Sequence, residues 1–170
     1  MDKNNSVKNI CVTALLAAMI TVMTAYIGHI PVGANGGYIH FGDSLIYIGA
    51  VLLPTPYAMI AAAIGGGLAD LLTAPMWMIP TIIIKALIVL PFSRKGEKIV
   101  TTRNVVATLI AFLISGTGYY IAEAILFGTE TAFFMSLLGS ATQSGGSAII
   151  FIVLGLVLDK AGFKKRFEVK

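Results

Sequence analysis

The sequence predicts an all-α integral membrane protein with six transmembrane helices and with both the N- and C-termini in the cytoplasm. Three observations lead to this prediction. Of the 170 residues, 57% are hydrophobic and only 12% are charged, about half the charged fraction of a soluble domain. The mean hydropathy is +0.89, and the chain contains successive apolar runs, several of them near the roughly 20 residues that a membrane-spanning helix needs. Almost all lysine and arginine residues fall on one side of the predicted membrane.

The predicted spans follow one another through short connections, so we expect one transmembrane domain over residues 1–170. Helix is the expected structure because an open sheet edge cannot satisfy its backbone groups in lipid. The N-terminal apolar run has no convincing cleavage site for a signal peptide, and we expect it to be retained as the first helix. The second run is short and stops at Pro54-Thr55-Pro56. The predicted spans are residues 9–29, 43–53, 57–72, 78–92, 105–127 and 132–158.

The distribution of basic residues predicts the orientation. Six crossings place the N-terminus, the turn at 54–56, the loop 93–104 and the C-terminus on one side of the membrane. Eleven of the 12 lysine and arginine residues lie on that side, and the opposite loops contain none. The positive-inside rule makes the basic side cytoplasmic. The remaining basic residue, Lys85, lies within the fourth span.

Ionisable side chains inside the spans mark a candidate binding site. A charge at the bilayer centre costs about 2.5–3.5 kcal/mol on insertion scales, yet Asp70, Lys85 and Glu123 lie within spans and Asp43 opens the second. At a rise of about 1.5 Å per residue, all four fall in the outer half of the membrane. This common depth favours an outward-facing polar cavity. The alternative is a set of ion pairs, such as Asp70 or Glu123 with Lys85, that only stabilises helix packing.

Further polar and aromatic residues lie where they could line such a cavity. Trp77, at the outer end of the fourth span, is either an interfacial anchor or a ring that stacks on a ligand. Gln143 and Ser144 interrupt the sixth span and either line the cavity floor or form hydrogen bonds between helices. The candidate lining residues besides the ionisable ones are Asn35, Tyr38, His40, Trp77, Tyr119, Gln143 and Ser144.

Motif spacing argues against several other functions. The two histidines, His29 and His40, lie eleven residues apart and offer no metal-ligand spacing, so we expect no metal and no cofactor. The basic residues lie at helix ends rather than in a patch with interleaved aromatic residues, which argues against nucleic-acid binding. No span pairs serine with lysine or histidine, so the chain is not expected to be an enzyme. The six spans leave no room for an ATPase domain.

Three sequence motifs carry a resemblance to a known family. The first helix contains "TALLAAM", in which Ala14 and Ala18 are small residues spaced by four, a spacing that lets helices approach closely. The segments "NGGYIHFGDSLIYIGAVLLPTPYAMIAAAIGGGLADLL" and "PMWMIPTIIIKALIVLP" follow. This order resembles the substrate-binding S components of energy-coupling factor (ECF) vitamin transporters, closest to their riboflavin-type or hydroxymethylpyrimidine-type branch. The resemblance covers nearly the whole chain and is most specific over residues 36–90.

The resemblance implies the S component of an ATP-driven vitamin importer in the bacterial cell membrane. It implies a vitamin site near the outer face, formed by the first outer loop and spans four to six. Ala14 and Ala18 would contact a membrane coupling subunit, and two cytoplasmic ATPase subunits would hydrolyse ATP. A thiamine-precursor pyrimidine is the first expected substrate, followed by pyridoxine-like or riboflavin-like compounds.

Two other classes of function stay open at this stage. One is a self-sufficient proton-coupled secondary carrier of a small polar solute, with Asp70, Lys85 and Glu123 as a proton relay. The other is a structural or assembly factor without a transported ligand.

Overall fold

The computed structural model describes residues 3–27, 30–32 and 37–168, with side chains described except at 3–5, 30–32, 37–39, 129–139 and 168. Helices form most of this part of the chain, as the sequence predicts. The elements in chain order are α1 (Lys3–Ala25), β1 (Ile30–Val32), β2 (Gly37–Ile39), α2 (Gly42–Leu52), α3 (Thr55–Thr73), the 3-10 helix η1 (Pro75–Trp77), α4 (Met78–Leu87), α5 (Thr102–Phe127), α6 (Thr129–Lys160) and α7 (Phe163–Glu168).

Each predicted span contains a helix, but boundaries in the first half of the chain differ from the prediction. α1 ends at Ala25, whereas the prediction extended it to residue 29. α4 ends at Leu87, and turns occupy residues 88–91 where the prediction continued the helix to residue 92. Pro91 accounts for this earlier end, because proline cannot donate the backbone hydrogen bond that a further helical turn requires.

The C-terminal helices are longer than predicted. α5 begins at Thr102 because Thr101 caps it: the Thr101 hydroxyl accepts a hydrogen bond from the backbone N–H of Asn104 at 3.2 Å. α6 extends the predicted span at both ends. The short helix α7 in the basic tail was not predicted.

The connection between α1 and α2 contains an antiparallel two-stranded hairpin, which the prediction did not include. The sequence does carry a signal for it, because Asn35-Gly36 is a dipeptide typical of tight hairpin turns between two short apolar runs. The paired residues of β1 and β2 are Ile30 with Ile39, Pro31 with Tyr38, and Val32 with Gly37.

Four helices in the described part of the chain are long and apolar enough to cross a membrane. The remaining two candidates, over Gly42–Leu52 and Pro75–Leu87, are shorter apolar helices. The 11 residues of α2 cover roughly 16 Å, about half the thickness of a hydrocarbon core. Six crossings therefore stay a prediction. The four long segments are Ser6–Ala25, Thr55–Thr73, Thr102–Phe127 and Ser140–Lys160.

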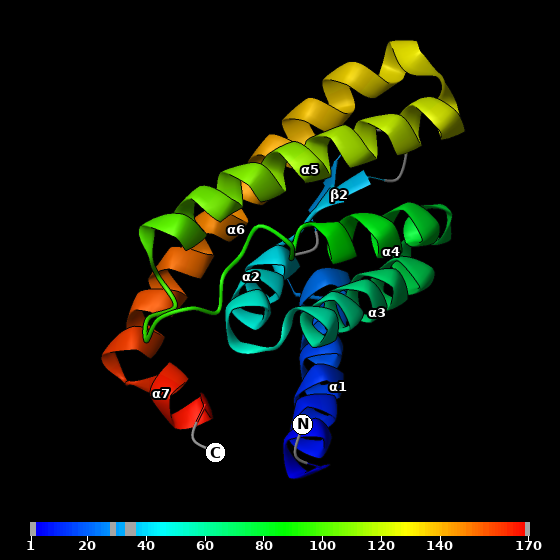
Figure 1. Ribbon diagram of the computed structural model, residues 1–170. Coiled ribbons are helices and arrows are strands. Elements are labelled where there is room, and N and C mark those ends of the chain that lie inside the picture. The colour runs from blue at the N-terminus through cyan, green and yellow to red at the C-terminus, as the bar shows by residue number, and fades with distance from the viewer. Residues whose placement is uncertain (1–2, 28–29, 33–36, 169–170) are drawn as a thin grey trace.

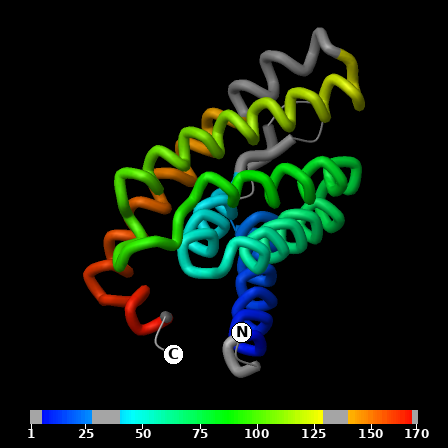
Figure 2. The backbone as a smooth tube through the Cα atoms, viewed as in Figure 1, coloured from blue at the N-terminus to red at the C-terminus, as the bar shows by residue number. Residues whose placement is uncertain are grey.

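The helices form two groups that meet at α2. α3 packs against α1 on one side and α4 on the other, while α5 and α6 form a long antiparallel pair (Figure 1). α2 contacts both groups, and the backbone trace shows α4 and α5 as the other place where the groups meet (Figure 2). Both labelled chain ends lie at the same end of the molecule, as six crossings would require (Figure 1).

The core is built around α2, of which every residue except Leu45 is buried. Tyr47 of α2 stacks on Phe92, with ring centroids 4.9 Å apart, and meets Phe151 of α6 edge-on at 6.0 Å. Because α2 is surrounded by other helices, its length is set by the core rather than by the membrane. This explains how so short an apolar helix fits into the bundle.

Consecutive glycines let α3 lie close to two neighbours at once. A Cβ atom added at Gly65 would lie 2.7 Å from the Cβ of Ile20 and 2.8 Å from the carbonyl oxygen of Ala17, both in α1. One residue further, a Cβ at Gly66 would lie 2.9 Å from the Cγ of Lys85 in α4. These distances are too short for real atoms, so the small residues are what permits the packing.

Replacing Gly65 with alanine is expected to destabilise the protein by about 1–3 kcal/mol, the usual cost of overpacking a tight interface. The matched control is Gly145→Ala in α6, where an added Cβ meets nothing within 4 Å among the described residues. Because alanine favours helix over glycine, the control should be neutral or stabilising by up to about 1 kcal/mol. Thermal unfolding in detergent measures both, and equal melting temperatures would contradict the proposed contact.

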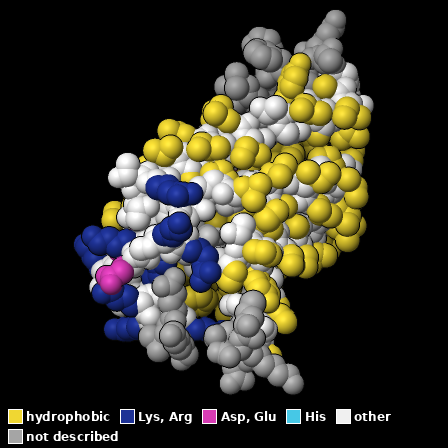
Figure 3. Space-filling view, viewed as in Figure 1, with side chains coloured by type: hydrophobic (Ala, Val, Ile, Leu, Met, Phe, Trp, Pro, Cys, Tyr) yellow, Lys and Arg dark blue, Asp and Glu magenta, His cyan; other side chains and the backbone are white. Residues whose placement is uncertain are grey.

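The end of the molecule that carries the termini is basic. Figure 3 shows lysine and arginine side chains gathered there, while hydrophobic side chains cover most of the rest of this face. Lys165 and Glu97 form an exposed ion pair at 2.8 Å, and the hydrogen bond from Lys165 lowers the pKa of the Glu97 carboxyl. Exposed pairs of this kind contribute little to stability.

Buried and partly buried polar contacts hold the loop between α4 and α5 at this end. The carboxylate of Asp159 in α6 accepts hydrogen bonds from the backbone N–H groups of Ile99 and Val100, at 2.7 and 3.0 Å. The side-chain amide of Asn104 donates to the carbonyl oxygens of Ser93 and Ile99, at 3.1 and 3.0 Å. The two helix groups are thus joined firmly at the basic end.

Candidate functional site

A buried ion pair joins α2 to α4 near the middle of the molecule. The ammonium of Lys85 donates to both carboxylate oxygens of Asp43, at 2.7 and 2.9 Å. The side chains are only 1% and 0% exposed, respectively. Asp43 lies in the first turn of α2, where the helix dipole also favours a negative charge.

Gln143 of α6 completes this arrangement, which we call the ion-pair cluster (Asp43, Lys85 and Gln143). Its side-chain N–H donates to Asp43 Oδ2 at 2.9 Å. One carboxylate therefore links three helices that are distant in sequence. The desolvation cost of burying the two charges is offset only by the hydrogen bonds between them. Loss of one partner therefore strongly lowers the stability of the fold.

Aromatic rings lie beside the ion-pair cluster. The hydroxyl groups of Thr81 and Tyr119 are hydrogen-bonded at 2.9 Å, and the Lys85 ammonium lies 5.4 Å from the centroid of the Tyr119 ring. Trp77 meets Tyr119 edge-on, with centroids 6.0 Å apart. Since Trp77, Thr81 and Lys85 are spaced by four, they lie on one face of the α4 segment.

A row of polar residues on α6 faces the same interior. Ser140, Gln143, Ser144 and Ser147 follow the spacing of one helix face and are all buried. Within the described residues, the hydroxyl oxygens of Ser147 and Ser115 and the indole nitrogen of Trp77 have no hydrogen-bond partner. Leaving a buried polar group unsatisfied costs about 1–3 kcal/mol, so these atoms are places where a polar ligand or an ordered water would bind favourably.

His40 connects the loop between α1 and α2 to these helices. Its Nδ1 atom accepts a hydrogen bond from the backbone N–H of Gly42 at 3.0 Å and lies 3.4 Å from the hydroxyl oxygen of Thr24 at the end of α1. A Cβ at Gly42 would lie 2.0 Å from that hydroxyl oxygen, so glycine is required here. The base of the loop is therefore held against both α1 and α2.

Asp70 and Glu123 are buried, with 4% and 5% exposure, and both interact with other groups. Asp70 lies one turn beyond Gly66, which contacts Lys85, and Glu123 lies one turn beyond Tyr119. The sequence suggested either residue as the partner of Lys85. The ion pair that the structure describes is instead with Asp43.

The structure thus brings Asp43, Lys85, Gln143, Tyr119 and Trp77 together, with His40 two residues before α2. Ser144 faces the same interior. Tyr38 lies in β2, but its side chain is outside the described part, and Asn35 lies outside the described residues altogether. Contact between these residues and a ligand stays a prediction.

Sequence reasoning missed several polar residues of this interior. Thr81 could have been found from its spacing of four before Lys85, and Ser147 from the same spacing after Gln143. Ser115 and Tyr47 carry no comparable signal, because a lone serine or tyrosine within an apolar span is common. Ala14 and Ala18, the predicted partner contacts, are both exposed on α1.

Comparison with known proteins connects this geometry to a family. The family model described as "ECF-type riboflavin transporter, S component" matches residues 4–160. A protein from Pyrococcus woesei, described as "Uncharacterized protein in gap 3'region", is 30% identical to this chain over 146 residues. That match covers 83% of this chain and 95% of the relative.

Proposed function

This chain belongs to the family of ECF-type riboflavin transporter S components. We propose that it binds a small vitamin or vitamin precursor and that Ala14 and Ala18 of α1 contact the coupling subunit. Membership makes it a multi-pass membrane protein and a vitamin-type substrate-binding subunit of an ECF transporter. The family is one of transporters rather than of catalysts. It implies association with a membrane coupling component and ATPases, which we propose to be one coupling subunit and two cytoplasmic ATPase subunits in a bacterial plasma membrane.

The proposed substrate is a small planar vitamin or precursor that contains a pyrimidine ring. A thiamine-precursor pyrimidine (hydroxymethylpyrimidine) is the first candidate, and riboflavin, whose ring system includes a pyrimidine ring, is the second. Pyridoxine is the matched alternative with a pyridine ring. The observation that supports this choice is the pair of rings, Trp77 and Tyr119, beside buried polar atoms without partners. A planar heterocycle offers a face to stack on and edge groups that pair with such atoms.

The ion-pair cluster has a different proposed role from the one that the sequence suggested. Asp43 and Lys85 are almost completely buried, and the Lys85 ammonium donates hydrogen bonds to both carboxylate oxygens of Asp43. We therefore propose that they fix α2, α4 and α6 beneath the ligand and orient the Gln143 amide, while the aromatic and amide groups contact the ring. The full set proposed for the site is Asn35, Tyr38, His40, Asp43, Asp70, Trp77, Lys85, Tyr119, Glu123, Gln143 and Ser144.

Ligand titration of the purified chain, without partners, tests this proposal. Trp77 is the only tryptophan in the sequence, so its fluorescence reports on the site directly. Saturable quenching or a spectral shift is expected with hydroxymethylpyrimidine, and its affinity is expected to exceed the affinities for riboflavin and pyridoxine. Tyr119→Phe should weaken binding by up to about tenfold, because the hydrogen bond between the Tyr119 and Thr81 hydroxyls, worth about 0.5–1.5 kcal/mol, no longer holds the ring in its stacking position. The control is Tyr57→Phe, in the first turn of α3 at the end away from Asp70. This variant should bind the ligand as the wild type does.

The result that contradicts the substrate is saturation by pyridoxine alone or by none of the three compounds. Uptake assays in vesicles address the energy source separately. Accumulation of the ligand by the chain alone, driven by a proton gradient and without ATPase subunits, would support the secondary-carrier function instead.

A further inference from the structure

The imidazole of His40 caps the first turn of α2. The backbone N–H of Gly42, the first residue of this helix, donates to His40 Nδ1 at 3.0 Å. The first N–H groups of a helix have no carbonyl partner within the helix, so a buried one needs an acceptor from outside it. The side chain of the N-cap residue, Phe41, does not supply one. His40, which is only 4% exposed, takes this role.

The direction of this hydrogen bond requires a neutral imidazole. A backbone N–H can only donate, so the Nδ1 atom of His40 must carry a lone pair. An imidazolium has a proton on both ring nitrogens and cannot accept. The backbone at Gly42 has little room to turn away, because an added Cβ would lie 2.0 Å from Thr24 Oγ1 and 3.0 Å from His40 Nδ1. A proton on Nδ1 is therefore incompatible with this arrangement of the first turn.

Charged groups near His40 act on its proton in opposite directions. The Asp43 carboxylate lies close enough for its charge to interact with His40, and it attracts a proton to the imidazole. This carboxylate is already bound by the Lys85 ammonium and the Gln143 amide. The positive end of the α2 dipole disfavours a further cation at the same place. The neutral form thus depends on a balance that a change of pH can shift.

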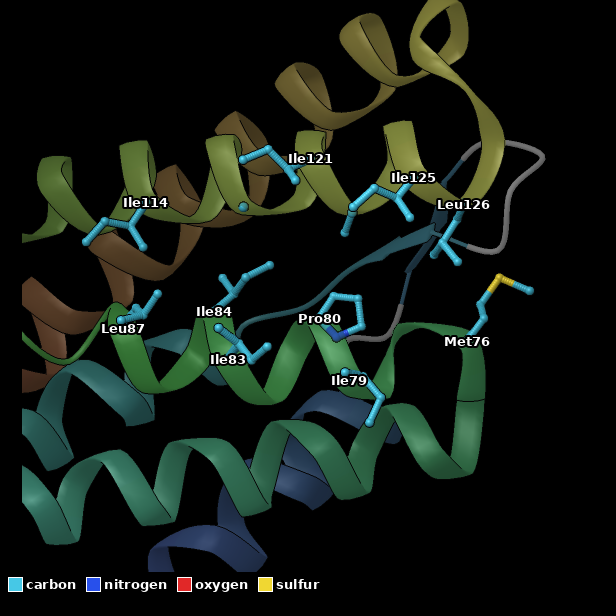
Figure 4. A pocket seen from close by; sticks show the side chains of 12 residues that line it. Met76, Ile79, Pro80, Ile83, Ile84, Leu87, Ile114, Ile121, Ile125 and Leu126 are labelled. Atoms are coloured by element: carbon cyan, nitrogen blue, oxygen red, sulfur yellow. The ribbon is translucent and has the colours of Figure 1, made fainter.

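Other elements near His40 contribute no further group that ordinarily titrates between about pH 5 and 8. α1 contributes the hydroxyl of Thr24. Tyr38 of β2 and Glu130 of α6 have side chains outside the described part, and tyrosine and glutamate ordinarily titrate near about pH 10 and 4.3. Apolar residues and glycine line the groove between α4 and α5, so its lining adds no titratable group (Figure 4). Histidine is the side chain whose charge ordinarily changes in this range.

The first turn of α2 connects His40 to the ion-pair cluster. Gly42, which His40 holds, is followed directly by Asp43. The Asp43 carboxylate accepts hydrogen bonds from Lys85 of α4 and from Gln143 of α6. Movement of this turn would therefore displace the carboxylate that orients the Gln143 amide.

We propose that His40 makes ligand binding at this site depend on pH. Neutral His40 holds the first turn of α2, and with it Asp43, in the binding arrangement. A proton on Nδ1 places one N–H donor against another, breaks the hydrogen bond to Gly42 and releases the turn. Because only the neutral form binds, affinity is highest above the histidine pKa and falls as the pH is lowered through it. This inference rests on the function proposed above, since it concerns regulation of the same site.

The ligand-free protein tests the switch without assuming a substrate. His29 is the only other histidine in the sequence, so nitrogen NMR of histidine-labelled wild type and His29→Asn assigns the His40 signals. Spectra are compared at about pH 7.5 and about pH 5, on either side of the ordinary histidine pKa of about 6.5. Nδ1 of His40 is expected to lack a proton at the higher pH and to carry one at the lower pH.

Thermal unfolding of the same ligand-free protein shows whether this proton affects the fold. The control is His40→Asn, whose Oδ1 can accept the hydrogen bond from Gly42 but does not titrate in this range. The unfolded chain binds the proton that the capped helix excludes, so stability is lost as the pH falls. From the higher to the lower pH, the wild-type melting temperature should fall by at least about 3 °C more than that of His40→Asn. His29→Asn should keep the full wild-type decrease.

Ligand titration at the same two pH values tests the effect on binding. A histidine of ordinary pKa that must be neutral raises Kd by roughly 30-fold over this range. With hydroxymethylpyrimidine, the rise in Kd for the wild type is expected to be at least about fivefold greater than the rise for His40→Asn. Titration of the ligand itself affects both proteins equally and cancels in this ratio.

Two results would overturn the proposal. One is a His40 that keeps the same charge throughout this pH range. The other is a wild type whose melting temperature and Kd change with pH as those of His40→Asn do. Absence of binding by every vitamin tested would instead contradict the proposed function, and the NMR and melting results on the ligand-free protein would still decide whether His40 controls the first turn of α2.

Discussion

Replacement of Lys85 by methionine is expected to lower the free energy of unfolding by about 3–5 kcal/mol and to abolish ligand binding. Methionine matches the length of the lysine stem but leaves the fully buried carboxylate of Asp43 without its cation. Removal of one member of a buried ion pair has this cost because the remaining charge stays desolvated. Thermal unfolding in detergent, together with the Trp77 titration, measures both effects.

Two further variants separate the charge effect from a packing effect. Asp43→Asn combined with Lys85→Met removes both charges and should recover most of the lost stability, because neutral groups can be buried at little cost. Lys165→Met removes the exposed ion pair with Glu97 and should change stability by less than about 1 kcal/mol. A double variant no more stable than Lys85→Met would show that the lysine stem, packed on Gly66, matters more than its charge.

Replacement of both Ala14 and Ala18 by leucine is expected to abolish vitamin uptake while leaving ligand binding intact. Both alanines are exposed in the isolated chain, and the added bulk would prevent close approach of a helix from the coupling subunit. Uptake is measured in cells that express the complete transporter, and binding with the purified chain. Ala141→Leu makes the same change at an exposed position of α6 and is the matched control.

The native cysteine gives an independent reading of this surface. Cys11 is exposed and lies one turn before Ala14 on the same side of α1. Because it is the only cysteine in the sequence, a membrane-permeant maleimide labels one site. Assembly with the coupling subunit should protect Cys11 from labelling, and the double leucine variant should lose this protection. If binding and uptake fall together, or if Cys11 reacts equally in the complex, α1 is not the contact surface.

Much of the fold could be predicted from hydropathy and charge. Apolar length places the helices, and the lysine and arginine count predicts which ends lie together. This argument also put Asp43 and Lys85 at one depth, and the structure brings them into contact. It could not identify them as partners, because depth does not specify the direction in which a side chain points around its helix.

The remaining features depend on packing that a sequence pattern does not encode. Gln143 reaches Asp43 only because α6 lies along α2, although 100 residues separate them. The hairpin was not predicted, because strands of only three residues are too short to show an alternating pattern. No local pattern predicts the contacts of Asn104 and Asp159 either, because each side chain forms hydrogen bonds with backbone groups outside its own helix.

The wide sequence separation within the ion-pair cluster has a consequence for biosynthesis. Asp43 enters the membrane 42 residues before Lys85 and 100 residues before Gln143. At a synthesis rate of about 5–20 residues per second, Lys85 is made roughly 2–8 s after Asp43, and Gln143 roughly 5–20 s after it. Because an unpaired carboxylate is costly in the hydrocarbon core, we expect α2 to stay near water or the insertion machinery during that interval. The last long helix, α6, therefore completes the environment of a charge that is synthesised near the start of the chain.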